Sequence, residues 1–371
     1  MTDLDSSKKA TPRTILLFRN AGDWIQALAG LAGIIWVTGN LFLLTQCLLI
    51  PHFPLGMVGR VYNFNTLVIP VILLCTGILI LLIGRKKTLS VGTKRCALGM
   101  IALAVLLSAV HLYATHIEPH RLVLRTITLQ TPKLGRPLTL LHISDIQSAH
   151  VGEYEESVFA QIRELNPDLI VHTGDLLQPV PASTWDSEYP KIKALFNTLS
   201  PSLGLFTVLG NTDVDQMDYF ANGVGNMRVL QSEDIVIPWG DHRLHLYGMT
   251  LDQSWSTNPQ PIREWFDRTD SQDFTILLGH TPNFILAVQD IPIDLCLAGH
   301  THGGQIRIPC FGPLTVLSEI PLAWGRGYRP VGETHLNVSA GIGCEHYNEI
   351  PPIRLFCPPE MTLFRMEPMK P

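Results

Sequence analysis

The sequence predicts a protein of the α/β class, with three apolar helices at the N-terminus followed by a layered α/β domain. Two observations predict this arrangement. Residues 1–116 hold ten Lys and Arg but only three acids, a net charge of +7, whereas residues 117–371 hold 17 Lys and Arg against 29 acids, a net charge of −12. Beyond residue 116, short apolar runs of strand type alternate with helical stretches and end at polar side chains. The contrast indicates two differently solvated parts.

The three apolar helices are predicted to be membrane spans. Residues 24–59, 61–84 and 96–117 contain no Asp, Glu, Lys or Arg. Because a helix needs about 20 apolar residues to cross the hydrocarbon core of a bilayer, we expect spans near residues 24–50, 66–84 and 96–116, within a membrane region of residues 1–116. A buried helical bundle is the alternative. A signal peptide is disfavoured, since the first run is too long and two more follow.

The charges of the connecting segments predict the orientation. Arg60 is the one basic residue in the first loop, residues 51–65. The N-terminal segment and the second loop hold all the others of this region, namely Lys8, Lys9, Arg13, Arg19, Arg85, Lys86, Lys87, Lys94 and Arg95. Short cytoplasmic segments carry the excess of Lys and Arg. We therefore expect a cytoplasmic N-terminus and an extracytoplasmic domain of residues 117–371, on the periplasmic or extracellular face.

The outer domain has the pattern of alternating strands and helices. Helices are expected at residues 154–165 and 191–199. Strands are expected at residues 121–131, 137–144, 168–172, 203–209, 229–237, 242–248, 275–278, 293–297, 314–316, 335–338 and 361–365. The sheet content is therefore high and mixed. In such folds, functional side chains collect at the carboxyl ends of strands.

Charge and cysteine content limit the partners of this domain. Its net negative charge argues against binding a polyanion, so no nucleic acid is expected. No C-x-x-C spacing is present. A disulfide among Cys310, Cys344 and Cys357 stays open for an oxidising compartment, whereas Cys296 lies in an apolar run and is expected to be a packed thiol.

Side chains that can bind metal follow five of the expected strands directly. They are Asp145, Asp175, Asn211, His280 and the pair His300 and His302. One such residue alone is more often structural, but five strand ends in one domain predict a metal site. Imidazole and carboxylate bind Zn, Mn or Fe, and amide oxygen favours harder ions such as Mn or Mg. Two ions about 3.5–4 Å apart suit in-line displacement at phosphorus.

The motifs resemble those of the calcineurin-like metallophosphoesterases over roughly residues 138–366. The matching strings are Ser144-Asp145-Ile146-Gln147, Thr173-Gly174-Asp175, Gly210-Asn211-Thr212-Asp213, Gly279-His280 and Gly299-His300-Thr301-His302. Gly303-Gly304-Gln305 and residues 338–343 look like the membrane-anchored branch of that family. The resemblance implies a four-layer αββα metallophosphoesterase sandwich and a metal-dependent phosphoric ester hydrolase, with phosphodiesterase activity favoured.

The resemblance also implies roles for the site residues. One metal ion would be held by Asp145, Asp175 and His302, and a second by Asp175, Asn211, His280 and His300. The two divalent ions are Mn, Fe, Zn or Mg, with Mn favoured. Asp175 would bridge them, and a hydroxide held between them would attack phosphorus in line. Asp175, Asn211 and Thr212 are the expected catalytic residues.

Two positions depart from the family pattern. Gln147 stands where the family usually has histidine, so the first site loses an imidazole and gains an amide oxygen; His150 is the alternative replacement. Thr212 stands where the family usually has a histidine that stabilises the phosphoryl group or protonates the leaving oxygen. A threonine hydroxyl donates a hydrogen bond but is no general acid near pH 7. We expect activity, because Asp175 and three histidines remain.

The tether between the last predicted span and the first predicted strand is only a few residues long, residues 118–120. The domain should therefore lie at the bilayer surface, which indicates the partners to expect. A phosphoesterase at the bilayer surface would meet membrane lipid, and its substrate would be a phospholipid or a lipid-linked phosphoester. The resemblance permits both, since family members act on phospholipids and on UDP-diacylglucosamine. Two rival readings stay open. One is a degenerate fold that acts as a metal- or partner-binding envelope module, and the other is a structural membrane protein.

Overall fold

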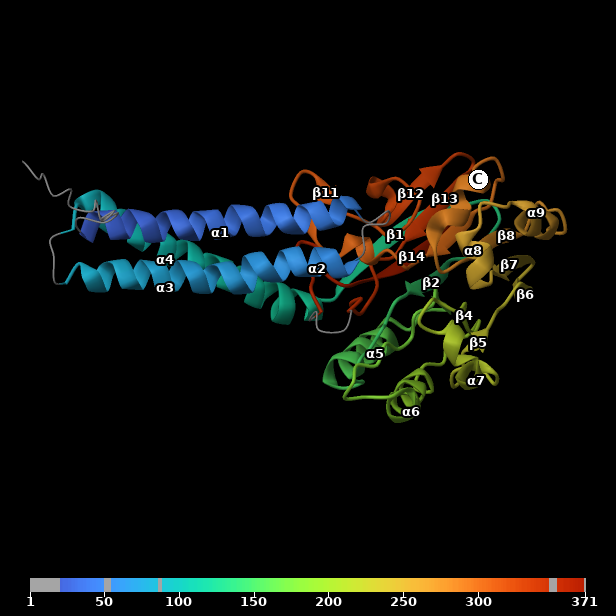
Figure 1. Cartoon of the computed structure of the whole chain (residues 1–371). Helices are drawn as coiled ribbons and strands as arrows, with labels where there is room; N and C mark the ends of the chain where they lie inside the picture. Colours follow the sequence, from blue (N-terminus) through green and yellow to red (C-terminus); the bar gives the residue numbers. More distant parts are fainter. Residues whose placement is uncertain (1–20, 50–54, 86–88, 347–351, 370–371) are drawn as a thin grey trace, which may run out of the picture. The chain divides into compact units, whose positions relative to one another are not determined.

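The computed structural model describes residues 21–49, 55–85, 89–346 and 352–369. They divide into two compact units (Figure 1). The first contains the apolar helices as far as His111, and the second contains the chain from Leu112 onward.

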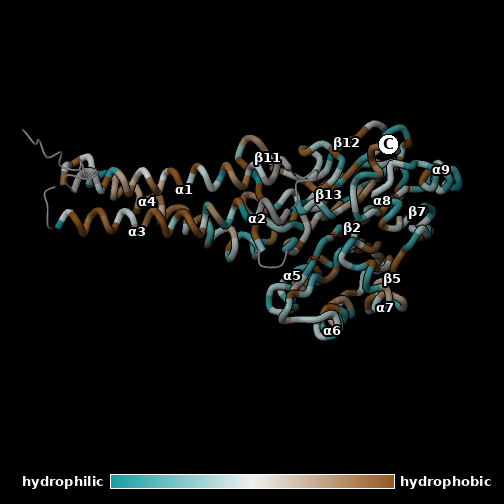
Figure 2. The backbone as a smooth tube through the Cα atoms, viewed as in Figure 1, coloured by the Kyte–Doolittle hydropathy of each residue, from teal (hydrophilic) through white to brown (hydrophobic). Residues whose placement is uncertain are grey.

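The first unit is entirely helical in its regular structure. Its helices are α1 (Ala21–Leu49), α2 (Leu55–Asn63), which continues through the π-helical segment Phe64–Val68 into α3 (Ile69–Ile83), and α4 (Val91–Leu112). Within the described residues, three stretches are long and apolar enough to cross a membrane: Trp24–Leu43, Gly59–Ile83 and Val91–His120. Figure 2 shows α3 as apolar over nearly its whole length. The prediction of three apolar N-terminal helices is confirmed.

The helices begin earlier than expected. Arg60 lies within α2, not in a loop. Residues Leu55–Asn63 contain one charged residue among apolar ones, and a single arginine does not prevent a helix. The basic residues Lys8, Lys9, Arg13, Arg19, Lys86 and Lys87, on which the predicted orientation rests, lie outside the described residues.

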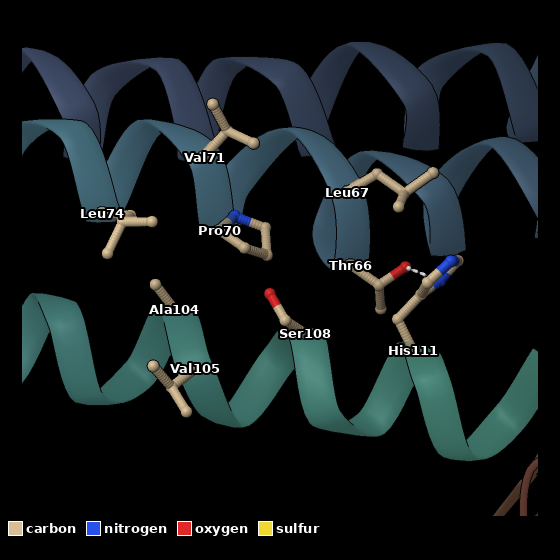
Figure 3. A pocket seen from close by; sticks show the side chains of 9 residues that line it. All are labelled: Thr66, Leu67, Pro70, Val71, Leu74, Ala104, Val105, Ser108 and His111. Carbon is tan, nitrogen blue, oxygen red and sulfur yellow. Dashed lines mark hydrogen bonds between the residues drawn. The ribbon is translucent and has the colours of Figure 1, made fainter.

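The helices of the first unit carry a few polar contacts. Asn40 and Asn65 exchange side-chain hydrogen bonds of 2.8 and 3.2 Å. A groove of about 320 Å³ lies between the segment around Pro70 and α4, and Thr66 and His111 meet at one end of it, 3.2 Å apart (Figure 3). Paired polar side chains of this kind are typical of contacts between helices in lipid.

The second unit is built on two six-stranded sheets. The strands of the first sheet, in spatial order, are β1 (Val123–Thr131), β14 (Glu360–Pro368), β2 (Leu138–Ile143), β3 (Leu169–His172), β4 (Leu205–Thr207) and β5 (Arg228–Val229). Those of the second are β12 (Gly327–Val331), β13 (Thr334–Val338), β9 (Leu295–Ala298), β8 (Phe274–Leu278), β7 (His242–Gly248) and β6 (Glu233–Trp239). Both sheets mix parallel and antiparallel pairs, as expected.

The two sheets pack face to face between layers of helix. Apolar side chains of both sheets, such as Leu140 and Leu246, form one core between them. The outer face of the first sheet is covered by α5 (Glu153–Leu165) and α6 (Trp185–Phe196), and that of the second by α9 (Gln260–Phe266) and the 3-10 segment Pro282–Ala287. Short helices α7 (Met217–Phe220) and α8 (Leu251–Trp255) complete the unit. The four-layer αββα architecture is confirmed.

Three local expectations differ from the structure. The strand expected at residues 314–316 is wrong, because the neighbouring segment Gly312–Pro313 (β11) pairs with Arg307–Ile308 (β10) instead. The strand expected at residues 229–237 is two strands, β5 and β6. Helix α6 begins six residues early, at Trp185, because the Thr184 side chain caps it by accepting the N–H of Ser187.

The cysteines of the second unit are free. Cys310 is exposed, and Cys296, Cys344 and Cys357 are buried thiols. The sequence left a disulfide open among Cys310, Cys344 and Cys357. The structure describes all three, and none of them forms a disulfide.

Candidate metal centre

The predicted metal-binding residues each follow a strand directly. Asp145 follows β2, Asp175 follows β3, Asn211 lies beyond β4, and His280 follows β8. Because β2, β3 and β4 run parallel, their carboxyl ends meet at one edge. Asp145, Asp175 and His280 each offer a ligand atom, and these atoms all lie within 4.8 Å of one another.

The backbone at this edge is held in an uncommon conformation. Five non-glycine residues have positive φ: Asp145 (48°), Gln147 (37°), Asp175 (61°), His300 (66°) and His302 (47°). The left-handed conformation costs roughly 1–2 kcal/mol for each such residue. Residues held in it are found most often at functional sites. Glycine is required beside them, since a Cβ at Gly210 would lie 2.1 Å from Asp175 Oδ1.

Asp175 is the most heavily bonded residue of the cluster. The Nε2 amide of Gln147 donates to Oδ2 over 2.9 Å, and the N–H and hydroxyl of Thr212 donate to Oδ1 over 2.9 and 3.1 Å. His280 Nε2 lies 3.4 Å from Oδ2. Burial would raise the pKa of Asp175, but the charge and hydrogen bond of His280, with the Thr212 N–H, hold this pKa below its ordinary value. Asp175 is therefore ionised.

Asp145 shares the buried environment without as many donors. Its carboxylate accepts the backbone N–H of His300 over 2.9 and 3.1 Å. Burial, with a smaller contribution from the charge of Asp175, raises the pKa of Asp145 to about 7 against the lowering effect of His280. Two buried carboxylates at this distance need positive charge nearby.

The ring of His280 is oriented by the backbone. Its Nδ1 lies 2.7 Å from the carbonyl oxygen of Thr173, which only accepts, so Nδ1 carries a hydrogen. Nε2 therefore points towards Asp175 and towards Asn211 Oδ1, 3.0 Å away. Burial opposes charge on the ring, but the carboxylates of Asp175 and Asp145 raise the pKa of His280 to about 9. Metal-ligating histidines are commonly fixed in this way, with the second nitrogen bonded to a carbonyl.

His300 presents a nitrogen to the same amide oxygen. Its Nε2 lies 3.1 Å from the carbonyl oxygen of Leu317, so this nitrogen donates. Burial lowers the pKa of His300 to about 4, and the ring is neutral. Its Nδ1 then faces Asn211 Oδ1 as an acceptor, 2.9 Å away. His300 Nδ1 and Asn211 Oδ1 are therefore two acceptors 2.9 Å apart, an arrangement that fits a cation bound by both.

His302 and Gln147 carry buried atoms without partners among the described residues. They are both ring nitrogens of His302 and Oε1 of Gln147. His302 Nε2 lies 3.5 Å from Asp145 Oδ1. An unpaired buried acceptor costs about 1–3 kcal/mol, so such atoms point to an ion or water. The chemistry of this donor set, carboxylate, imidazole and amide oxygen, fits divalent cations.

Glu345 is a candidate residue that the sequence reasoning missed. Its Oε2 accepts from the Gln147 amide over 2.8 Å, and its Oε1 accepts from the Gln178 amide over 2.7 Å. Burial raises the pKa of Glu345. The carboxylate thus stands next to Asp175, joined to it through the single amide nitrogen of Gln147. Gln178 bonds Glu345 and also the loop beyond it, through the N–H of His346.

Asp213 supports the cluster from behind. It accepts the backbone N–H groups of Gly210, Asp175 and Leu176 over 2.7–2.9 Å. It therefore ties the turn after β4 to the turn after β3.

Three further side chains of this domain have contacts of their own: His150, His142 and Trp255. His150 lies 4.0 Å from Glu188, on α6. His142 is buried and contacts Thr173 and Asn337. The Trp255 ring packs edge-on against the His300 ring, at a centroid distance of 4.9 Å. Tyr347 lies outside the described residues.

The chain is similar to known phosphoesterases. The family model for calcineurin-like phosphoesterase matches residues 138–304. The chain is 26% identical to the metallophosphoesterase YkuE of Bacillus subtilis over 274 residues, which cover 69% of this chain and 89% of YkuE. It is 25% identical to the UDP-2,3-diacylglucosamine pyrophosphatase LpxG of Chlamydia muridarum over 311 residues, covering 68% and 92% of the two chains.

One solved structure is also similar. It is YfcE, a phosphoesterase from E. coli, at 16% identity and a TM-score of 0.27, covering 57% of this chain and 82% of that one. The residues matched by the family model run from β2 to the segment that holds His300 and His302. They contain all five metal-binding motifs identified in the sequence. Residues 138–304 therefore form a calcineurin-like phosphoesterase domain, and the relatives of the chain include metallophosphoesterases.

Proposed function

We propose that this chain is a membrane-anchored, metal-dependent phosphodiesterase that acts on phosphoesters at the bilayer surface. The observation that carries the proposal is the cluster of Asp145, Asp175 and His280, whose ligand atoms lie within 4.8 Å of one another at strand ends of both sheets. The buried acceptors of His302 and Gln147 beside it support a further cation.

The proposal assigns two divalent ions, with Mn favoured, to this donor set. The first set is Asp145, Asp175 and His302, assisted by Gln147 and Glu345, and the second is Asp175, Asn211, His280 and His300. When bound, the ions supply Lewis acidity at the phosphoryl oxygens and lower the pKa of the attacking water. The chain's own contribution is orientation, because Thr212 and Gln147 fix the two oxygens of Asp175.

Thr212 sets the expected leaving-group preference. Its hydroxyl is committed to Asp175 over 3.1 Å and cannot supply a proton near neutral pH. We therefore expect fast hydrolysis of esters with good leaving groups, such as p-nitrophenol, and slow hydrolysis of alkyl esters. Thr212→His is expected to raise the alkyl rate relative to the p-nitrophenyl rate by about 10²-fold, the lower end of what general acid catalysis contributes. Equal effects on both substrates would contradict this role.

In the proposal, the three apolar helices anchor the chain in the membrane and determine on which side the domain lies. With a cytoplasmic N-terminus and three crossings, the domain lies outside the cytoplasm. Asp241, exposed in the turn between β6 and β7, offers a reporter position. Asp241→Cys in a chain whose other exposed cysteines are serines should react with a membrane-impermeant maleimide added to intact cells. Reaction only after the membrane is opened would contradict the orientation.

The substrate class of the proposal is a lipid that carries a phosphoester. LpxG is by its name a pyrophosphatase of UDP-2,3-diacylglucosamine. A phospholipid or another lipid-linked phosphoester is the substrate we propose here, because the catalytic unit begins at Leu112, inside the third apolar stretch. Hydrolysis of a lipid phosphodiester no faster than that of its soluble head-group analogue would contradict the lipid assignment.

A second candidate function has its own observation. Gln147 and Thr212 replace the two histidines of the family pattern, which favours a module that binds metal or a partner without turnover. That reading expects bound metal and no metal-dependent rate, so the same assay on bis-p-nitrophenyl phosphate separates the two.

A further inference from the structure

A row of apolar side chains is exposed on the second unit. It consists of Ile308, Phe311, Leu314, Leu322 and Phe356, here called the apolar rim. Phe311 is 88% exposed and Phe356 is 55% exposed. Four of the five belong to the segment from β10 to the turn at Leu322, and Phe356 lies on a neighbouring loop. A groove of about 530 Å³ runs between Phe311, Leu322 and Phe356.

The exposure of Phe356 is held in place by the backbone. Its φ is +55°, a conformation that bulky residues rarely adopt. Arg354, two residues before Phe356, is fully buried and donates to the carbonyl oxygens of Ala340, Gly343 and Cys357. The loop is therefore fixed from inside, and Phe356 points outward as a consequence.

The loop that holds Phe356 contacts the end of the third apolar stretch. The Phe356 N–H donates to Glu118 Oε2 over 2.9 Å, and the Arg354 N–H donates to the Ala114 carbonyl oxygen over 2.8 Å. Both partners lie in the candidate span Val91–His120. On the same turns Ile117 is exposed, one residue before Glu118. The rim thus begins where this helix would leave the hydrocarbon core.

We propose that the apolar rim inserts into the interface of the bilayer that holds the helices, with lipid acyl chains as its occupant. This inference rests on the proposed membrane anchoring and deepens it. Contiguous apolar patches exposed on a protein surface mark interaction sites. Phenylalanine and leucine are typical of segments that bury an apolar face at the head-group boundary.

The rim segment also contacts the candidate metal centre. Leu317, exposed between Leu314 and Leu322, offers its carbonyl oxygen to His300 Nε2 at 3.1 Å. A rim seated in lipid would therefore bring the site to the membrane surface, where a phosphoester carried on an acyl chain lies. The substrate class that fits is an amphiphile whose phosphoester stands at the head-group level.

Cys310, free and exposed beside Phe311, allows the depth to be measured. The full-length chain, with Cys47, Cys75 and Cys96 replaced by serine, is reconstituted in nanodiscs of phosphatidylethanolamine and phosphatidylglycerol. A nitroxide on Cys310 is then tested for collision with O₂, which partitions into lipid, and with a water-soluble nickel chelate. Asp241→Cys in the Cys310→Ser background is the control, because Asp241 is exposed in the turn between β6 and β7.

The expected result is strong O₂ and weak nickel collision at Cys310, with the reverse at position 241. Equal nickel collision at both positions would overturn the proposal. Spin–spin broadening that grows with the number of chains per disc would overturn it in favour of a second copy of the chain as the occupant.

A substrate comparison separates this inference from the proposed function. Phe311→Ser with Phe356→Ser is assayed on bis-p-nitrophenyl phosphate in water and on hexadecyl p-nitrophenyl phosphate embedded in the discs. The ratio of the hexadecyl rate to the soluble rate should fall at least about tenfold, because two apolar contacts with lipid are lost. An unchanged ratio would overturn the rim proposal. Absence of soluble hydrolysis in the parent chain would instead overturn the proposed function.

Discussion

Replacing Asp175 by asparagine is expected to lower metal-dependent hydrolysis of bis-p-nitrophenyl phosphate by at least about 10³-fold. The substitution keeps the shape of the side chain and removes its charge. A metal ion contributes several kcal/mol of transition-state stabilisation, and each 1.36 kcal/mol corresponds to about tenfold in rate. Asp175 would touch both ions in the proposed arrangement, so its loss affects both.

The control for this change is Asp290→Asn. Asp290 is exposed and pairs with Arg263 at the surface, so its replacement should leave the rate unchanged. Circular dichroism of both variants must match that of the parent chain. A folded Asp175→Asn chain with more than a tenth of the parental rate would contradict the central position of this carboxylate.

Replacing Glu345 by glutamine is expected to weaken the binding of one of the two proposed ions by about 10–100-fold, the range found when residues that support metal ligands are changed. Glu345 Oε2 and Asp175 Oδ2 accept from the same Gln147 nitrogen, at 2.8 and 2.9 Å. The family usually has a histidine at position 147, and this chain lacks its imidazole. The negative charge of Glu345 would attract the ion that this imidazole would otherwise bind. The measurement is metal content after dialysis against a graded series of Mn²⁺ concentrations.

Two variants decide whether Glu345 compensates for Gln147. Glu333→Gln changes an exposed acid in the turn between β12 and β13 and should bind metal as the parent does. Adding Gln147→His to Glu345→Gln should recover most of the lost affinity, because it returns an imidazole to the site. Full occupancy in Glu345→Gln alone would show that this carboxylate has no part in binding.

The strand ends of the site could be predicted because local sequence determines them. Asp145 and Asp175 come directly after apolar runs that form β2 and β3, and His280 comes after β8, so their positions follow from strand pattern alone. Parallel pairing then brings these ends together. The helix start at Trp185 was missed because it depends on a cap at Thr184, not on apolar spacing.

Glu345 could not be predicted from pattern. It lies in an irregular loop with no periodicity, and its contact with Gln147 joins residues 198 positions apart. The loop owes its course to long-range bonds, including those from the buried Arg354 to carbonyl oxygens around Gly343. The sequence showed that Gln147 departs from the family pattern. It did not show that Glu345 contacts Gln147. Only the fold supplies such pairs.

The measurement that tests the account most directly is the metal dependence of turnover. The full-length chain is stripped with a chelator, and hydrolysis of bis-p-nitrophenyl phosphate is followed while Mn²⁺, Zn²⁺ or Mg²⁺ is returned and bound metal is counted. The account predicts no turnover in the stripped chain and recovery with Mn²⁺ as occupancy approaches two ions per chain. A folded chain that fills both sites and still hydrolyses nothing would contradict it.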